Sequence, residues 1–173
     1  NSEFRQAWVG GFMEVLAVDS WGECFNNKKL PDALEEEQQE GDAEHEHETG
    51  PKAWRPAMAG QNEVKRKVLS LYKFALAIEN TREHDYVTEK VFDVLEAGVV
   101  PIYLGAPNWQ DFLPMHNAII DASAFETPHD VAEFVRELAS DEGRYQEMHR
   151  WREEELPAAV RDIEQTSFKH NLC

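Results

Sequence analysis

The sequence predicts an α/β fold in which helices flank a parallel sheet, and the stretch from residue 72 to residue 104 carries the main indications. Tyr72 to Glu79 is an apolar and aromatic run of strand length, and Val99 to Leu104 is a second run rich in β-branched residues. Between them, apolar residues recur with the period of a helix. A strand, a helix and a second strand in this order favour parallel pairing, because the helix returns the chain to the starting edge of the sheet.

The N-terminal residues are expected to form a helix followed by a strand. Ser2 to Glu14 has a helical apolar stripe, which Gly10 and Gly11 interrupt. Val15 to Asp19 is typical of a short strand. Farther along the chain, Glu63 to Leu71 recovers helical spacing and should lead into the first central strand.

Residues 32–58 have a different composition. Eight acidic residues lie between Glu35 and Glu48, and apolar residues are almost absent. Such a composition buries too little apolar surface to order itself, so we expect a disordered acidic segment within an otherwise single domain. His45 and His47 alternate with acidic residues there, but a flexible tract makes a poor preorganised metal site, and no metal is expected.

The helix between the two central strands should begin at Tyr86. Gly98 stands where a helix C-terminus favours glycine. The buried face of this helix should carry the apolar residues spaced by four, three and one, which are Val87, Val91, Val94 and Leu95. The helix is therefore amphipathic and packs on the sheet.

The polar loop that enters this helix, residues 80–85, is the candidate binding site. Ligands of open α/β sheets bind at the carboxyl ends of the strands, where helix N-termini bind anions such as a diphosphate. Lys90 would add a positive charge, and Glu89 could accept hydrogen bonds from sugar hydroxyls. An alternative is that Asp85, Thr88 and Glu89 only cap the helix while Lys90 is solvated.

Four further segments should complete the fold. Ala118 to Asp121 is a short strand, and Thr127, Pro128 and Asp130 have the pattern of a helix start. Further helices are expected from about Asp141 to Glu155 and from Pro157 to about Phe168.

Composition limits the function classes. The chain has 173 residues, 42% of them hydrophobic, which suits one globular domain. Its formal net charge of −17 disfavours binding to nucleic acid or to anionic membranes. The sequence holds no apolar run of membrane-spanning length, and it opens with neither a Met nor a signal peptide, so we expect a piece of a longer protein.

Three consecutive motifs carry a resemblance to a known family. FALAIEN at 74–80, DYVTEK at 85–90 and AGVVPIYLG at 97–105 together resemble the signature of the α1,3/1,4-fucosyltransferases of glycosyltransferase family 10. The continuation APNWQDFLP at 106–114 is most similar to plant-type members that fucosylate the N-glycan core, and DSWGECFNN at 19–27 resembles the family's DSYGxCxNN stretch. Ile78 departs from the pattern, which usually has an aromatic residue there.

The resemblance implies a fold and a reaction. The fold would be a Rossmann-like parallel sheet, the donor-binding C-terminal half of a GT-B glycosyltransferase, with residues 32–58 as an insertion. The reaction would be inverting transfer of L-fucose from GDP-fucose to a glycan or glycoprotein, α1,3 to GlcNAc of an N-glycan, with no obligatory metal or cofactor. The location would be the Golgi lumen, in a type II membrane protein whose anchor, acceptor domain and general base lie outside this chain. The chain alone is then expected to bind the donor but to transfer fucose poorly.

The resemblance also assigns roles to individual residues. Lys90 and Arg5 would stabilise the charge of the leaving GDP. The donor-binding set would be Asn80, Tyr86, Thr88, Glu89, Lys90 and Arg5. Cys24 and Cys173 match cysteines of the family and would form a possible disulfide. Two other functions stay open: a non-catalytic sugar-nucleotide-binding module, and a GT-B transferase with another donor or acceptor.

Overall fold

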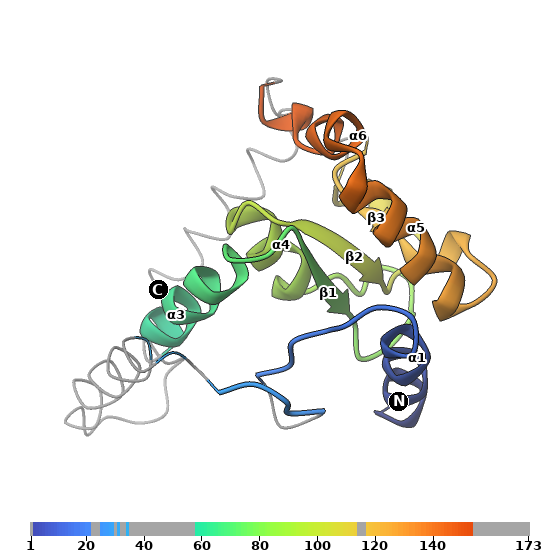
Figure 1. Ribbon diagram of the computed structural model, residues 1–173, viewed down its shortest axis with the longest axis horizontal. Coiled ribbons are helices and arrows are strands. Elements are labelled where there is room, and N and C mark those ends of the chain that lie inside the picture. Colours follow the sequence, from blue (N-terminus) through green and yellow to red (C-terminus); the bar gives the residue numbers. More distant parts are fainter. Residues whose placement is uncertain are drawn as a thin grey trace.

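Three parallel strands form the sheet of the computed structural model, which describes residues 2–21, 25–29, 31, 34, 58–113 and 117–153 (Figure 1). They are β1 (Phe74–Ile78), β2 (Val100–Leu104) and β3 (Ile120–Asp121), and they pair in the order β1-β2-β3. Both pairings are parallel, with Phe74 opposite Val100 and Ile102 opposite Ile120. The predicted parallel α/β fold is confirmed.

Helices cover both faces of this sheet. On one face lie α1 (Ser2–Met13) and α5 (Pro128–Ser140), and on the other α4 (Glu89–Glu96), with α3 (Met58–Leu69) packed against it (Figure 1). The short helix α6 (Glu142–Glu147) follows α5. Single 3₁₀ turns are formed by Trp109–Asp111, Ala122–Ala124 and Arg150–Arg152.

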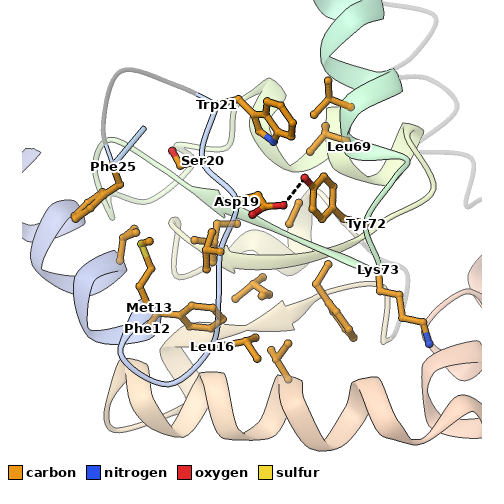
Figure 2. A pocket seen from close by; sticks show the side chains of 18 of the residues that line it. Phe12, Met13, Leu16, Asp19, Ser20, Trp21, Phe25, Leu69, Tyr72 and Lys73 are labelled. Atoms are coloured by element: carbon orange, nitrogen blue, oxygen red, sulfur yellow. Dashed lines mark hydrogen bonds between the residues drawn. The ribbon is translucent and has the colours of Figure 1, made fainter. Parts of the chain in front are cut away.

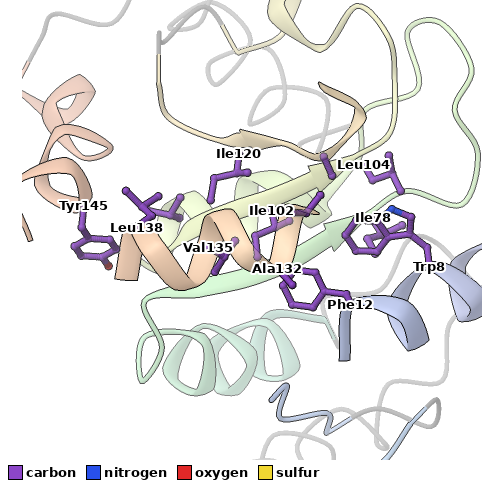
Figure 3. Packing of buried hydrophobic residues seen from close by; sticks show 13 residues of the cluster. Trp8, Phe12, Ile78, Ile102, Leu104, Ile120, Ala132, Val135, Leu138 and Tyr145 are labelled. Atoms are coloured by element: carbon purple, nitrogen blue, oxygen red, sulfur yellow. The ribbon is translucent and has the colours of Figure 1, made fainter. Parts of the chain in front are cut away.

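The central strand β2 supplies both hydrophobic cores. Ile102 and Leu104 enter the core shared with α1 and α5, which Figure 3 shows, and Tyr103 enters the core under α4. This division follows from the strand geometry, because successive side chains point to opposite faces. Every residue of β2 is buried, so the strand fixes the position of the chain segments that precede and follow it.

The expected strand from Val15 to Asp19 does not form. Residues 14–16 make a turn that continues the end of α1, and residues 17–20 have no regular structure. The side chain of Asn27 explains this: its amide donates to the carbonyl of Val18 at 2.8 Å and accepts from the N–H of Ser20 at 2.8 Å. These are the backbone groups that a sheet partner would use, so the segment satisfies them without joining β1.

Helix α4 begins later than expected. Residues 86–88 are not helical, and Thr88 stands at the N-cap position with an extended backbone (φ −116°, ψ −177°). The physical reason is that the backbone N–H and the hydroxyl of Thr88 both donate to Glu79, which draws this residue toward the end of β1.

Other boundaries differ by a few residues. The strands are shorter than expected at their ends, α3 begins at Met58 rather than at residue 63, and the helix expected to reach Glu155 is the short α6 followed by a 3₁₀ turn. The helix start at Thr127 is confirmed: Thr127 and Asp130 form a reciprocal capping box, and Pro128 is the first helical residue.

Several expectations lie outside the described residues. They are the helix at 157–168, both cysteines and nearly all of the acidic segment. Within the part of the chain that the structure describes, no helix is long and apolar enough to span a membrane.

Candidate functional site

Two of the predicted site residues, Arg5 and Asn80, meet just beyond the carboxyl end of β1. Asn80 is the second residue after this strand, and the guanidinium of Arg5 on α1 donates to its side-chain oxygen. The two residues are 75 positions apart in the sequence. The fold therefore brings the distant arginine beside the loop that leads to α4.

Lys90 lies in the first turn of α4 and faces three oxygen atoms. Its ammonium is 3.0 Å from Thr88 Oγ1, 3.3 Å from Glu79 Oε2 and 3.7 Å from Glu89 Oε1. The side chain is 26% exposed. Lys90 is thus a half-buried cation with fixed neighbours that still reaches the surface, and the alternative of a solvated helix lysine does not describe it.

Glu79 is the residue whose importance the sequence did not reveal. Its side chain is completely buried, and Oε1 accepts from the N–H of Thr88 at 2.7 Å while Oε2 accepts from the Thr88 hydroxyl at 2.7 Å. Glu79 was not among the residues expected to bind the donor. The signal was present, since a carboxylate that closes a buried apolar strand needs partners.

The alternative role of Thr88 as a capping residue is therefore only half correct. Thr88 occupies the N-cap position of α4, but its side chain makes no capping hydrogen bond. The hydroxyl donates to Glu79 and accepts from the ammonium of Lys90, so it joins the strand end to the lysine.

Gly105 makes room for this arrangement. A Cβ atom at this position would lie 2.3 Å from the hydroxyl of Tyr103 and 2.5 Å from Cγ of Glu79. The Tyr103 hydroxyl accepts from the N–H of Ala106 at 3.0 Å. Burial raises the pKa of Tyr103 above its ordinary value, and the charges of Glu79 and Asp121 add to this although the Ala106 N–H opposes it.

Asn108 holds the polar loop before α4. Its side chain accepts from the N–H of Asp85 at 2.9 Å and donates to Asp85 Oδ1 at 2.8 Å and to Asp111 Oδ2 at 2.9 Å. Asp85 has a φ of +63°, in the left-handed region that Asp tolerates better than most residues. These bonds fix the direction in which the loop leads to Tyr86, which is half-buried, and to Glu89, which is exposed.

A hollow lies along β1 rather than at Lys90. It is a cavity of about 570 Å³ between α1, the segment 16–21 and the end of α3, mostly lined by apolar side chains (Figure 2). The hydroxyl of Tyr72 donates to Asp19 at 2.8 Å on its wall, and burial together with the Asp19 carboxylate raises the pKa of Tyr72. Arg5 also lines this cavity.

A second hollow of about 360 Å³ lies beside the end of β2, where Leu104, Arg82 and Trp8 contribute to its wall. Lys90 lines neither of these two hollows. Among the described residues, no group of three or more His, Cys, Asp and Glu side chains could hold a metal ion.

Comparison with known proteins identifies the family. Residues 1–173 match the sequence model described as "Glycosyltransferase family 10 (fucosyltransferase) C-term". The chain belongs to glycosyltransferase family 10. The family expected from the three motifs is therefore confirmed.

Relatives come from animals and plants. An Arabidopsis thaliana alpha-(1,4)-fucosyltransferase is 39% identical over 148 residues, which are 86% of this chain and 34% of that protein. GDP-fucose protein O-fucosyltransferase 3 is 34% identical over 148 residues in both Xenopus laevis and Homo sapiens, again 86% of this chain but 27% of each relative. The chain thus spans about a quarter to a third of the length of these relatives, and its similarity to core-fucosylating plant members stays a prediction.

Solved structures share the fold. Crystal structures of an alpha1,3-fucosyltransferase with GDP-fucose and with GDP match with TM-scores of 0.59 and 0.58. They are 23% and 22% identical, and the matches cover 86% and 84% of this chain and 35% and 34% of those chains. The expected fold class, a Rossmann-like sheet from the C-terminal half of a GT-B fucosyltransferase, is confirmed.

Proposed function

We propose that this chain binds GDP-fucose at the carboxyl end of β1 and belongs to a fucosyltransferase that transfers L-fucose to a glycan or glycoprotein with inversion. The observation that carries this proposal is a pair of contacts just beyond β1. Arg5 contacts Asn80, and Lys90 contacts Glu79, the residue before Asn80. Two cations from separate elements thereby contact the two residues that follow β1, and the first-turn N–H groups of α4 also favour an anion. The family membership of the chain and the titles of the similar structures support the choice of donor.

The leaving group explains why two cations are needed. Breaking the bond between fucose and GDP leaves additional negative charge on the diphosphate, and preorganised cations lower the energy of that transition state. Lys90 and Arg5 take this role in our proposal. They are held by neighbouring side chains before the donor arrives, so little reorganisation accompanies the reaction.

The remaining donor-binding residues divide by exposure. Glu89 has a side chain that is 68% exposed and can accept hydrogen bonds from hydroxyls of fucose or ribose. Tyr86 and Asn80 would hold the nucleotide or the diphosphate. Thr88 already donates to Glu79 and accepts from Lys90, so we assign it an indirect part in donor binding.

The acceptor side of the reaction is proposed from the resemblance alone. A general base must remove the proton from the acceptor hydroxyl, and we place this base outside the chain. An α1,3 linkage to GlcNAc of an N-glycan, a Golgi location in a type II membrane protein and a reaction without an obligatory metal belong to the same proposal.

Calorimetric titration with GDP and GDP-fucose tests the donor site. We expect Lys90→Ala and Arg5→Ala each to weaken GDP binding at least about tenfold, because each removes a charge-assisted hydrogen bond worth about 1.5–3 kcal/mol. Arg136→Ala is the matched control, since Arg136 is an exposed arginine on α5 that pairs with Glu133. Equal GDP binding by the wild type and Lys90→Ala would place the diphosphate elsewhere, and equal affinity for GDP-mannose and GDP-fucose would point to another donor.

A further inference from the structure

Glu79 and Asp93 are the two charged residues that are buried within the described part of the chain. Asp93 pairs with Lys65 at 2.6 Å and so joins α4 to α3. Glu79 faces the N-terminal end of α4, where the candidate donor site lies. We propose that Glu79 is a positioning residue that fixes the ammonium of Lys90 for the diphosphate without touching the donor, an inference that rests on the proposed function.

The bonding of the Glu79 carboxylate supports this role. A carboxylate offers about four acceptor positions. Three donors occupy Glu79, and they are the N–H of Thr88, the hydroxyl of Thr88 and the ammonium of Lys90. All three donors come from one stretch of three residues. One buried carboxylate therefore fixes the backbone, the hydroxyl and the cation of the helix start as a unit.

The bonding of Lys90 shows what remains for a ligand. A lysine ammonium has three N–H donors. Two are directed to Thr88 Oγ1 and Glu79 Oε2, whereas Glu89 Oε1 lies at 3.7 Å, beyond hydrogen-bond distance. The side chain is 26% exposed while that of Glu79 is fully buried. Among the described residues no third acceptor lies within hydrogen-bond distance, so we take the third N–H to be the one that an incoming anion would bind.

Two opposing effects decide the sign of the role. The negative charge of Glu79 repels a diphosphate, but its oxygens are bonded to three donors, and its side chain is fully buried whereas that of Lys90 is 26% exposed. Without Glu79, Lys90 would regain rotamer freedom, and ordering it again would oppose binding of the ligand. We take preorganisation to be the larger effect, because the carboxylate is fully buried and its charge acts through the lysine.

The packing around Glu79 gives independent support. There is no space for a Cβ atom at Gly105, because it would lie 2.5 Å from Cγ of Glu79. The hydroxyl of Tyr103 lies against the same glycine and is itself held by the N–H of Ala106. The carboxylate is therefore confined by packing as well as by hydrogen bonds.

A double-mutant cycle with GDP as the probe tests the inference on the whole chain. We expect Glu79→Gln to weaken GDP binding about tenfold in the wild-type background and less than about twofold in the Lys90→Ala background. Gln keeps the size of the side chain and an acceptor for the N–H of Thr88, but it presents an amide to the lysine. Circular dichroism and thermal melting show whether the variant folds. A role confined to fold stability would not depend on Lys90.

Thr88→Val and Thr88→Ser provide a second route if Glu79→Gln does not fold. Loss of the hydroxyl in Thr88→Val should weaken GDP binding several-fold, and Thr88→Ser should bind like the wild type, because serine keeps the bonds to Glu79 and Lys90. Equal binding by Thr88→Val and Thr88→Ser would count against the inference.

The outcomes separate the two proposals. If Lys90→Ala leaves GDP binding unchanged, the proposed function fails at this site. If Lys90→Ala weakens binding while a folded Glu79→Gln binds equally or more tightly, the donor site stands and Glu79 is not a positioning residue. Additive losses in the double variant would likewise overturn the inference.

Discussion

At the scale of single residues, the site is built from groups that hold one another before any ligand arrives. Glu79 supplies the acceptors, Thr88 links them to the helix start, and Lys90 completes the set from the first turn of α4. Leaving a buried carboxylate unpaired would be costly, so each partner stabilises the fold as well as the site. Stability and donor binding are therefore coupled at these positions.

Gly105 offers the sharpest prediction on stability. Replacing it with alanine places a methyl group against the side chains of Tyr103 and Glu79, and both of these side chains are buried. We expect Gly105→Ala to lower the free energy of unfolding by about 1–3 kcal/mol, the usual cost of overpacking. Denaturant titration followed by circular dichroism measures it.

Gly143→Ala is the matched control for that substitution. A Cβ atom at Gly143 would meet only the side chain of Asp141, at an ordinary 3.5 Å. Its effect on the unfolding midpoint should be small or favourable. A Gly105→Ala variant as stable as Gly143→Ala would contradict the close packing of Glu79 described above.

The sequence predicted the members of the candidate site better than their bonds. The motifs pointed to Asn80 and Lys90, and the family pattern pointed to Arg5, which composition and periodicity alone would not have connected to the other two. The interaction of Thr88 with Glu79 escaped prediction, because a hydroxyl before a helix is normally assigned to capping. Only the arrangement in space shows that a strand carboxylate competes for it.

At the scale of elements, the spacing of hydrophobic residues predicted where the central strands and helices lie. Side chains that bond to backbone groups determined where some of these elements begin or end. The runs that became β1 and β2 are long and apolar, so burial determined them. The segment from Val15 to Asp19 has a similar composition, yet Asn27 takes the backbone groups that would have paired. Such a side-chain contact from a residue seven to nine positions away leaves no periodic trace in the sequence, which is why that strand prediction was wrong.

Helix α1 contains a glycine, Gly10, whose replacement by alanine should stabilise the protein. A Cβ atom at Gly10 would meet nothing within 4 Å, and the residue lies inside the helix. Glycine in a helix interior costs about 1 kcal/mol relative to alanine, so Gly10→Ala should raise the free energy of unfolding by about 0.5–1 kcal/mol. A thermal melt measures the shift.

Gly98 supplies the contrasting control at the end of α4. Its φ is +85°, a conformation that alanine adopts with strain, and Gly98→Ala should therefore lower the melting temperature. Equal shifts for both glycine variants would show that Gly10 is not in a helical environment.

At the scale of the whole molecule, electrostatic repulsion opposes a compact state. The formal net charge of −17 is large for 173 residues, whereas the candidate donor site gathers the cations Arg5 and Lys90. An anionic donor must therefore approach a negatively charged protein and bind where positive charge is local. Salt screens the repulsion between the anionic donor and the net negative charge over the whole surface. It screens the attraction between the donor and the local cations only at short range.

Stability should consequently rise with ionic strength. Raising NaCl from about 50 mM to about 500 mM shortens the screening length from more than 10 Å to a few ångströms, which weakens repulsion among the acidic residues. The ion pairs of the described residues oppose this, but most of them are exposed, such as Arg150 with Glu147, and exposed pairs contribute about 1 kcal/mol or less each. We expect the free energy of unfolding to increase by about 1 kcal/mol, measured by urea titration at each salt concentration. KCl should act equally, since screening depends on ionic strength rather than on the cation, and a decrease in both salts would mean that the ion pairs outweigh the net charge.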